Sequence, residues 1–294
     1  MRLNLLRTAL VLFILFTASG VWAESSVWVA KSSKGNVYLA GSFHILRASD
    51  YPLPAEFLTA YKDSRKIIFE VPPGETESPE YMGKFLSLAI YNDGTTLKEH
   101  ITTAAYAKAE NFCKERNYPL EQYQFFKPTF FVMTLTVSEM NKIGADPQKG
   151  IDYFFKDKAM QDGKATGSLE TMDQQLALLT SMDASLGSDQ ILESIEELKQ
   201  IEVMLGELLA VWRKGDEAKM EELYIKDLKL YSKLYQTLIV DRNNKWVRNI
   251  ESYLNGSGNT MVVVGAAHLI GVDGLVNLLR KRGYKVVKSQ GGGR

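Results

Sequence analysis

The sequence contains only three histidines, and two of them end the same short pattern near opposite ends of the chain. His44 ends Gly41-Ser42-Phe43-His44, and His268 ends Gly265-Ala266-Ala267-His268. Each Gly-x-x-His follows an apolar run that is typical of a buried strand. A side chain just past the carboxyl end of a strand lies where α/β sheets usually bind ligands. The matched positions therefore predict that both imidazoles converge on one site.

A third group with possible chemistry is the carboxylate of Glu70, which lies at the end of an otherwise apolar, strand-like run over residues 66–71. A buried carboxylate is costly unless it is paired or binds a metal. The alternative is an exposed glutamate at a strand end. We expect a parallel neighbouring strand to bring Glu70 beside His44. Two imidazoles and a carboxylate suffice for a catalytic metal site with an open position, so His44, Glu70 and His268 are candidate ligands.

A divalent ion at such a site would lower the pKa of a bound water or polarise a carbonyl group. Neither histidine belongs to a His-Glu-x-x-His helix, so that zinc-protease geometry is absent. A metal-free alternative stays open, in which one histidine is the general base and Glu70 orients it. A serine triad is less well supported, because Ser42 does not lie in a Gly-x-Ser-x-Gly turn.

Two strand-helix-strand units would position these side chains. The first has strands over 26–30 and 36–39, a helix after Pro54 and a strand over 66–71. The second has a strand over 260–264, a helix over 273–282 and a strand over 284–287. Residues from about 78 to 257 are predicted to be mostly helical. We therefore expect an α/β (α+β) fold in one domain, with a mixed central sheet from both units and a large helical insertion.

Within the insertion, apolar residues at helical spacing predict one long amphipathic helix over residues 190–212. Gly215 would break it, and Asp216 would cap the next helix. Another helix is expected to begin at Asp241. A strand-like run over residues 164–170 ends in a carboxylate, Glu170, which could also serve as an acidic residue at a helix start.

The chain begins with the features of a secretory signal peptide over residues 1–23, namely basic residues, an apolar run and Ala23 before the expected cleavage point. The protein is therefore expected to be exported as residues 24–294, with no membrane span after cleavage. Basic and acidic residues balance at 35 each, so nucleic acid is not an expected partner. Cys113 is the only cysteine, which excludes an internal disulfide. The oligomeric state stays open.

As an ordered set, the motifs resemble the TraB/GumN family, which includes the TIKI proteases. The resemblance spans about residues 27 to 287. It rests on the order of the motifs along the chain and not on any one motif alone. They are Gly41-Ser42-Phe43-His44, Tyr51-Pro52-Leu53-Pro54, Glu70, Gly150-Ile151-Asp152, Leu169-Glu170-Thr171 with Gln174-Gln175-Leu176, Trp212 with Gly215-Asp216, Arg242-Asn243 with Trp246, and Gly265-Ala266-Ala267-His268-Leu269 with Gly271.

This resemblance implies a fold shared with the erythromycin esterase and ChaN-like groups, and a metal-dependent peptidase by analogy with the TIKI branch. It makes His44, Glu70 and His268 metal or catalytic residues, with manganese, cobalt or zinc as the ion. It adds Glu170 and Arg242 as supporting residues of catalysis, since a permanent cation suits a carbonyl oxygen that gains negative charge. Ser42 and Asn243 are the expected substrate contacts.

The leading expectation is an exported, periplasmic hydrolase that uses a metal and acts on a peptide or an amide-like small molecule. The competing expectation is a non-enzymatic metal- or haem-binding protein of the ChaN-like type. The pair Arg242 and Glu170 favours hydrolysis, because a simple ligand site needs neither residue.

Overall fold

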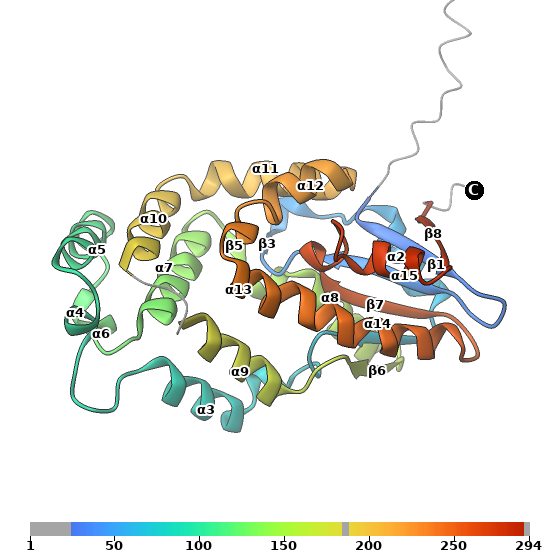
Figure 1. Cartoon of the computed structure of the whole chain (residues 1–294), viewed down its shortest axis with the longest axis horizontal. Coiled ribbons are helices and arrows are strands. Elements are labelled where there is room, and N and C mark those ends of the chain that lie inside the picture. The colour runs from blue at the N-terminus through green and yellow to red at the C-terminus, as the bar shows by residue number, and fades with distance from the viewer. Residues whose placement is uncertain (1–24, 184–187, 291–294) are drawn as a thin grey trace, which may run out of the picture.

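The computed structural model describes residues 25–183 and 188–290, so the expected signal peptide lies outside the described residues. A six-stranded mixed sheet forms one half of the molecule (Figure 1), with the strand order β6-β4-β7-β2-β1-β8. The strands are β1 (Val27–Lys31), β2 (Val37–Ser42), β4 (Lys66–Phe69), β6 (Ala165–Ser168), β7 (Thr260–Gly265) and β8 (Lys285–Lys288). A small second sheet pairs β3 (Leu46–Arg47) with β5 (Ala145–Asp146).

The four strands β6, β4, β7 and β2 run parallel, and β1 lies antiparallel to both β2 and β8. Every residue of β2 and β7 is buried, as expected for central strands covered on both faces. The hairpin expected from the first two apolar runs is β1 and β2. The predicted mixed α/β fold is confirmed.

Helices cover the sheet and also form the other half of the molecule (Figure 1). The α-helices are α2 (Ala55–Asp63), α3 (Pro79–Ala89), α4 (Leu97–His100), α5 (Thr103–Arg116), α6 (Leu120–Tyr123), α7 (Pro128–Lys142), α8 (Ile151–Gln161), α9 (Met172–Asp183), α10 (Ser188–Leu198), α11 (Ile201–Lys214), α12 (Glu217–Tyr224), α13 (Ser232–Tyr235), α14 (Asp241–Leu254) and α15 (Leu275–Lys281). A π-helical turn, Gln236–Val240, joins α13 to α14.

The strand order corrects one expectation about the site. β4 and β2 are parallel but are not neighbours, because β7 lies between them. Glu70 and His44 therefore lie on either side of the end of β7 rather than on adjacent strands. The insertion also contributes β6, which pairs with β4 at the edge of the sheet.

The single helix expected over residues 190–212 is two helices, α10 and α11, with a break at Lys199 and Gln200. Ile191, Ile195 and Leu198 of α10 join a core inside the helical half, and so does Ile201, the first residue of α11. Leu205, Leu209 and Trp212, further along α11, join the core under the sheet. The helix pair therefore connects the two cores.

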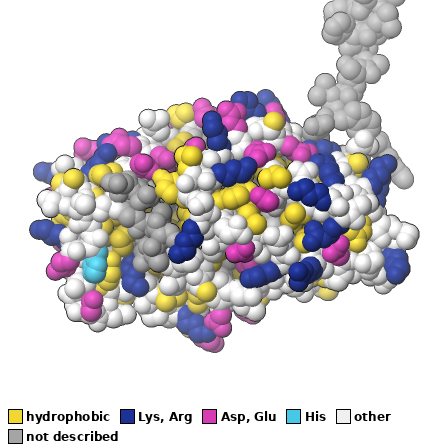
Figure 2. All heavy atoms as spheres, viewed as in Figure 1, with side chains coloured by type: hydrophobic (Ala, Val, Ile, Leu, Met, Phe, Trp, Pro, Cys, Tyr) yellow, Lys and Arg dark blue, Asp and Glu magenta, His cyan; other side chains and the backbone are white. Residues whose placement is uncertain are grey.

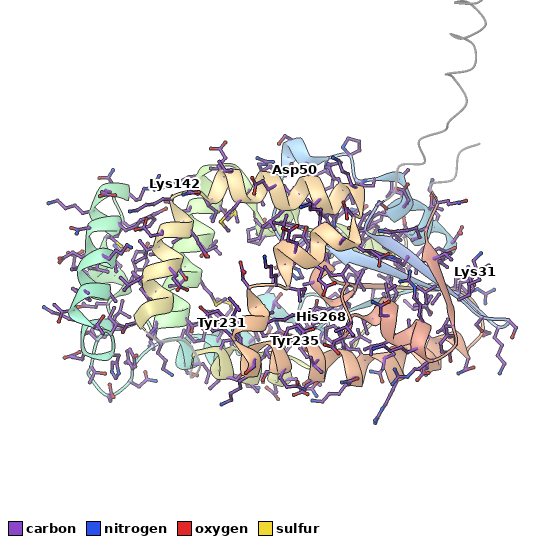
Figure 3. All side chains as sticks on the ribbon, turned by 45° about the horizontal axis from the view of Figure 1, so that its top comes forward. Lys31, Asp50, Lys142, Tyr231, Tyr235 and His268 are labelled. Atoms are coloured by element: carbon purple, nitrogen blue, oxygen red, sulfur yellow. The ribbon has the colours of Figure 1, made fainter. Side chains whose placement is uncertain are left out.

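The outer surface mixes both signs of charge. Basic and acidic side chains are interspersed over the face shown in Figure 2 rather than gathered into one field. His268 lies inside the fold, whereas Lys31 and Lys142 extend from its surface (Figure 3). Among the residues that the structure describes, no helix has the length and apolar character needed to cross a membrane.

Candidate active site

The predicted site lies at the carboxyl ends of the parallel strands, where β2, β7 and β4 finish side by side. Ser42 ends β2, Gly265 ends β7, and Glu70 follows directly after β4. β4 stops there because Pro72 and Pro73 follow and lack the backbone N–H that a ladder requires. The neighbouring β6 ends at the same level, where the backbone N–H of Glu170 donates to the carbonyl of Glu70 at 2.8 Å.

Gly265 keeps a small space open between the two motifs and Glu70. A Cβ atom added at Gly265 would lie 3.2 Å from Nε2 of His44, 3.3 Å from Oε1 of Glu70 and 3.7 Å from Cδ2 of His268. Glycine at this position therefore lets the three side chains approach one another over the end of β7. The backbone N–H of Gly265 also donates to Oε1 of Glu70 at 2.6 Å.

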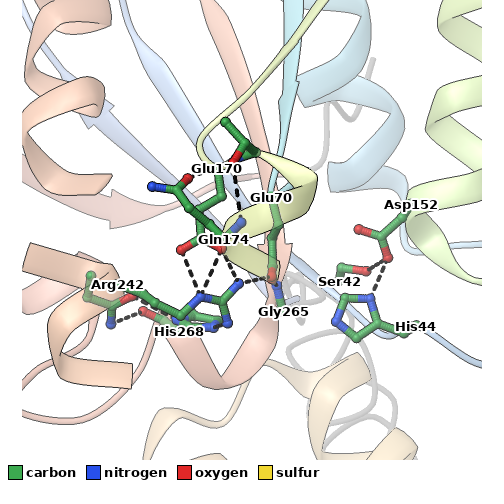
Figure 4. Close-up of polar contacts among 11 residues, drawn as sticks. Ser42, His44, Glu70, Asp152, Glu170, Gln174, Arg242, Gly265 and His268 are labelled. Atoms are coloured by element: carbon green, nitrogen blue, oxygen red, sulfur yellow. Dashed lines mark hydrogen bonds and ion pairs between the residues drawn. The ribbon is translucent and has the colours of Figure 1, made fainter. Parts of the chain in front are cut away.

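Arg242, in the first turn of α14, joins the two glutamates of the site (Figure 4). Its Nη2 donates to Oε2 of Glu70 at 2.6 Å, and its Nε donates to Oε1 of Glu170 at 3.0 Å. All three residues are less than a tenth exposed. One guanidinium thus neutralises part of the charge of two buried carboxylates, which would otherwise repel each other. Its flat face lies over the ring of Trp246, 4.5 Å from the centroid, one helical turn further on.

His268 is held as a neutral imidazole by its hydrogen bonds. The Asn243 amide nitrogen donates to the carbonyls of His268 and Asp273, which leaves the Asn243 oxygen to accept from Nδ1 of His268 at 2.8 Å. Nε2 of His268 then accepts from Nη1 of Arg242 at 3.0 Å. Both ring nitrogens are therefore engaged, and burial lowers the pKa of His268 to about 3.

His44 has a different environment, because 60% of its side chain is exposed. Its Nδ1 lies 2.7 Å from Oδ2 of Asp152, and the hydroxyl of Ser42 donates to the same carboxylate oxygen (Figure 4). Asp152 belongs to the first turn of α8. Gly150, just before that helix, passes so close to the His44 carbonyl that a Cβ would lie 2.2 Å from its oxygen. The run Gly150-Ile151-Asp152 thus brings a carboxylate to His44 through a close backbone approach.

The charges of the site follow from these contacts. The negative charge of Asp152, with a smaller contribution from Glu70, raises the pKa of His44 to about 9. Burial opposes ionisation of Glu70, but Arg242 and the Gly265 N–H outweigh it and hold its pKa at about 2. At neutral pH the site therefore contains a protonated, accessible His44 close to an ionised, buried Glu70.

A pocket of about 370 Å³ opens beside these two residues. Its polar lining includes His44, Glu70 and Asp152, and much of the remaining wall is apolar. The pocket thus combines convergent polar groups with an apolar wall, as small-molecule sites generally do.

The predicted three-ligand metal set does not fit this arrangement. Nε2 of His44 and Oε1 of Glu70 face the same space over Gly265, which suits two ligands of one ion. His268 offers no free nitrogen, because Arg242 and Asn243 occupy both. Across residues 25–183 and 188–290, no three His, Cys, Asp or Glu side chains are grouped so that they could hold a metal ion.

The structure brings together all the candidate residues named from the sequence, as two connected groups on either side of Gly265. One contains Glu70, Glu170, Arg242, Asn243 and His268, and the other contains Ser42 and His44. Asp152 joins the second group although it was not among the candidates. Its signal was the motif Gly150-Ile151-Asp152, but an acidic residue in the first turn of a helix has an ordinary structural explanation.

Comparison with known proteins supports the family resemblance. The uncharacterized protein YbaP of Escherichia coli K12 is 22% identical over 246 residues, which cover 83% of this chain and 87% of that protein. The protein of the same name from Shigella flexneri matches equally well. No solved structure is significantly similar to this chain. Residues 26–288 match the TraB/PrgY/gumN family as a whole, and the chain belongs to that family.

Proposed function

We propose that this protein is an exported hydrolase that cleaves peptide or amide bonds in the space between His44 and Glu70. The observation that carries the proposal is the pairing of an accessible His44–Asp152 couple with a buried, ionised Glu70 across Gly265, beside a pocket. Such a juxtaposition supplies a proton donor and a hydrogen-bond acceptor on two sides of one small space.

Amide hydrolysis needs a water directed at the carbonyl carbon and a proton for the departing nitrogen. His44 is protonated at neutral pH and is placed to donate from Nε2, while Asp152 holds the ring from the other side. Glu70, which Arg242 and the Gly265 N–H hold in place, can accept a hydrogen bond from the attacking water through Oε1. As the water oxygen bonds to the carbonyl carbon, its proton passes to Glu70, and the proton of His44 passes to the nitrogen as the C–N bond breaks. The proton on Glu70 then returns to His44, which restores both groups.

Arg242 acts in this proposal through Glu70 and His268 rather than on the substrate directly. Its guanidinium is engaged with two carboxylates and one imidazole, so its main role is to keep Glu70 ionised and in place. The sequence-based role as a direct partner of the carbonyl oxygen would require Arg242 to leave one of these contacts.

Metal dependence stays part of the proposal in a restricted form. A bound divalent ion would supply a water of lowered pKa. His44 and Glu70 are the protein ligands that the geometry favours, whereas the third expected ligand, His268, is engaged by Arg242.

The test is cleavage of a quenched fluorescent peptide pool by the purified mature protein, without metal and with manganese, cobalt or zinc. His44→Ala should abolish cleavage. His100→Ala is the matched control, since His100 lies in α4 and stacks on Tyr91 in the helical half. Stoichiometric metal binding that His44→Ala removes, with no cleavage under any condition, would instead support the non-enzymatic metal-binding alternative.

A further inference from the structure

The wall of the pocket beside His44 is mostly apolar. It includes Ile45, Phe69, Val71, Pro72 and Pro73. Four of these residues lie at the end of β4 and in the turn after it, on both sides of Glu70 in the sequence, and the two prolines restrict the backbone of that turn. The pocket therefore has a stiff apolar wall that begins one residue from Glu70.

Lys156 is the one lysine that the described residues contribute to the lining, and it already has its own partners. Its Nζ lies 2.8 Å from Oε1 of Glu77, 3.6 Å from Oδ1 of Asp157 and 4.4 Å from the centre of the Tyr153 ring. An acidic ligand would have to compete with Glu77 and Asp157 for this ammonium group. The other cation in the lining, His44, is likewise paired with a carboxylate, Asp152, so the pocket favours an uncharged occupant.

We propose that this pocket binds a large apolar side chain of a peptide substrate, next to the bond that is cleaved. A pocket of about 370 Å³ is at the small end of ligand sites, which suits one or two side chains. The proposal deepens the proposed hydrolase function and rests on it for the position of the scissile bond.

The test measures binding rather than turnover, so it does not depend on cleavage. N-acetyl-phenylalanine methylamide and N-acetyl-glutamate methylamide are titrated against the mature protein and followed by saturation-transfer NMR. Val71→Lys places a charge on the apolar wall and should weaken binding of the phenylalanine probe at least about tenfold. Val203→Lys is the matched control, because Val203 is 62% exposed on α11, and it should bind like the wild type.

Preference for the glutamate probe, absence of binding of the phenylalanine probe to the wild type, or equal binding by Val71→Lys and the wild type would overturn the proposal. If the probe binds as expected but no peptide is cleaved, the hydrolase function fails while the pocket assignment stands.

Discussion

Replacing Arg242 by Met should be among the most destabilising single changes in the site. The substitution keeps much of the length and the apolar stem of the side chain but removes the guanidinium. It breaks the hydrogen bonds to Glu70, Glu170 and His268, which measure 2.6, 3.0 and 3.0 Å for the closest contact of each. Two carboxylates that are each 9% exposed then lose the cation they share. Removing one partner of a buried ion pair costs about 3–5 kcal/mol, so we expect a loss in this range.

The assay is urea unfolding at pH 7, followed by circular dichroism. Arg248→Met is the matched control, because Arg248 lies on the exposed face of the same helix, and it should change the free energy of unfolding by no more than about 0.5 kcal/mol. A loss of less than about 1 kcal/mol for Arg242→Met would refute the argument, because it would put the pair in the range of exposed ion pairs.

The stability deficit of Arg242→Met should also depend on pH in a direction that can be predicted. Without Arg242, burial raises the pKa of Glu70 in the folded protein above its value in the unfolded chain. The folded variant then binds a proton that the unfolded chain does not bind, so the deficit should shrink as the pH falls from 7 to 5. One proton over two pH units recovers at most about 2.7 kcal/mol. A deficit that grows over this range would contradict the assignment of Glu70 as the residue that Arg242 keeps ionised.

Three further predictions address the remaining parts of the site. Gly265→Ala should lower peptide cleavage about 100-fold, because the added methyl group fills the space between the reacting groups. The free energy of unfolding should change by less than about 1 kcal/mol, because the Gly265 φ of −49° suits alanine. Gly206→Ala, where an added Cβ meets nothing within 4 Å, is the control, and full activity of Gly265→Ala would remove the space from the mechanism. Asp152→Asn should lower the pKa of His44 from about 9 toward its ordinary 6.5, which NMR titration of the histidine signals measures directly, and an unchanged pKa would exclude Asp152 as its cause. Because the folded-state pKa of His268 is about 3, only the unfolded chain binds its proton between pH 6.5 and 3. As the pH is lowered through this window, His268 should therefore decrease the free energy of unfolding by at most about 1.4 kcal/mol per pH unit. His268→Gln should show a smaller decrease per pH unit. Equal slopes for the two proteins would contradict a neutral, buried His268.

The sequence pointed to residues that the structure brings together, but it did not predict how they are arranged. The paired Gly-x-x-His motifs and the apolar run before Glu70 marked strand ends, and strand ends of parallel sheets share one edge. The strand order was not predictable in the same way, because nothing in the residue pattern states that β7 lies between β2 and β4. That order gives Gly265 its place between His44 and Glu70.

Two other features depend on contacts that are distant in sequence. Asp152 binds a histidine 108 positions earlier, and this contact depends on the close approach of Gly150 to the His44 backbone. The two helices α10 and α11 connect the core of the helical half, which includes Ile201, to the core under the sheet, which begins with Leu205. The helical spacing of apolar residues continues through residues 199 and 200. This spacing therefore predicted one helix, because it carries no information on which core an apolar residue joins.

The central claim is that His44 and Glu70 carry out hydrolysis in the space over Gly265. Its most direct test is digestion of a peptide pool in water enriched in ¹⁸O, with mass spectrometry of the products and with metal-free and metal-supplemented arms. We predict new carboxyl termini that carry one ¹⁸O atom with the wild-type protein, and none with His44→Ala or Glu70→Gln. Absence of new termini in every wild-type arm, or equal labelling by the His44→Ala protein, would contradict the claim.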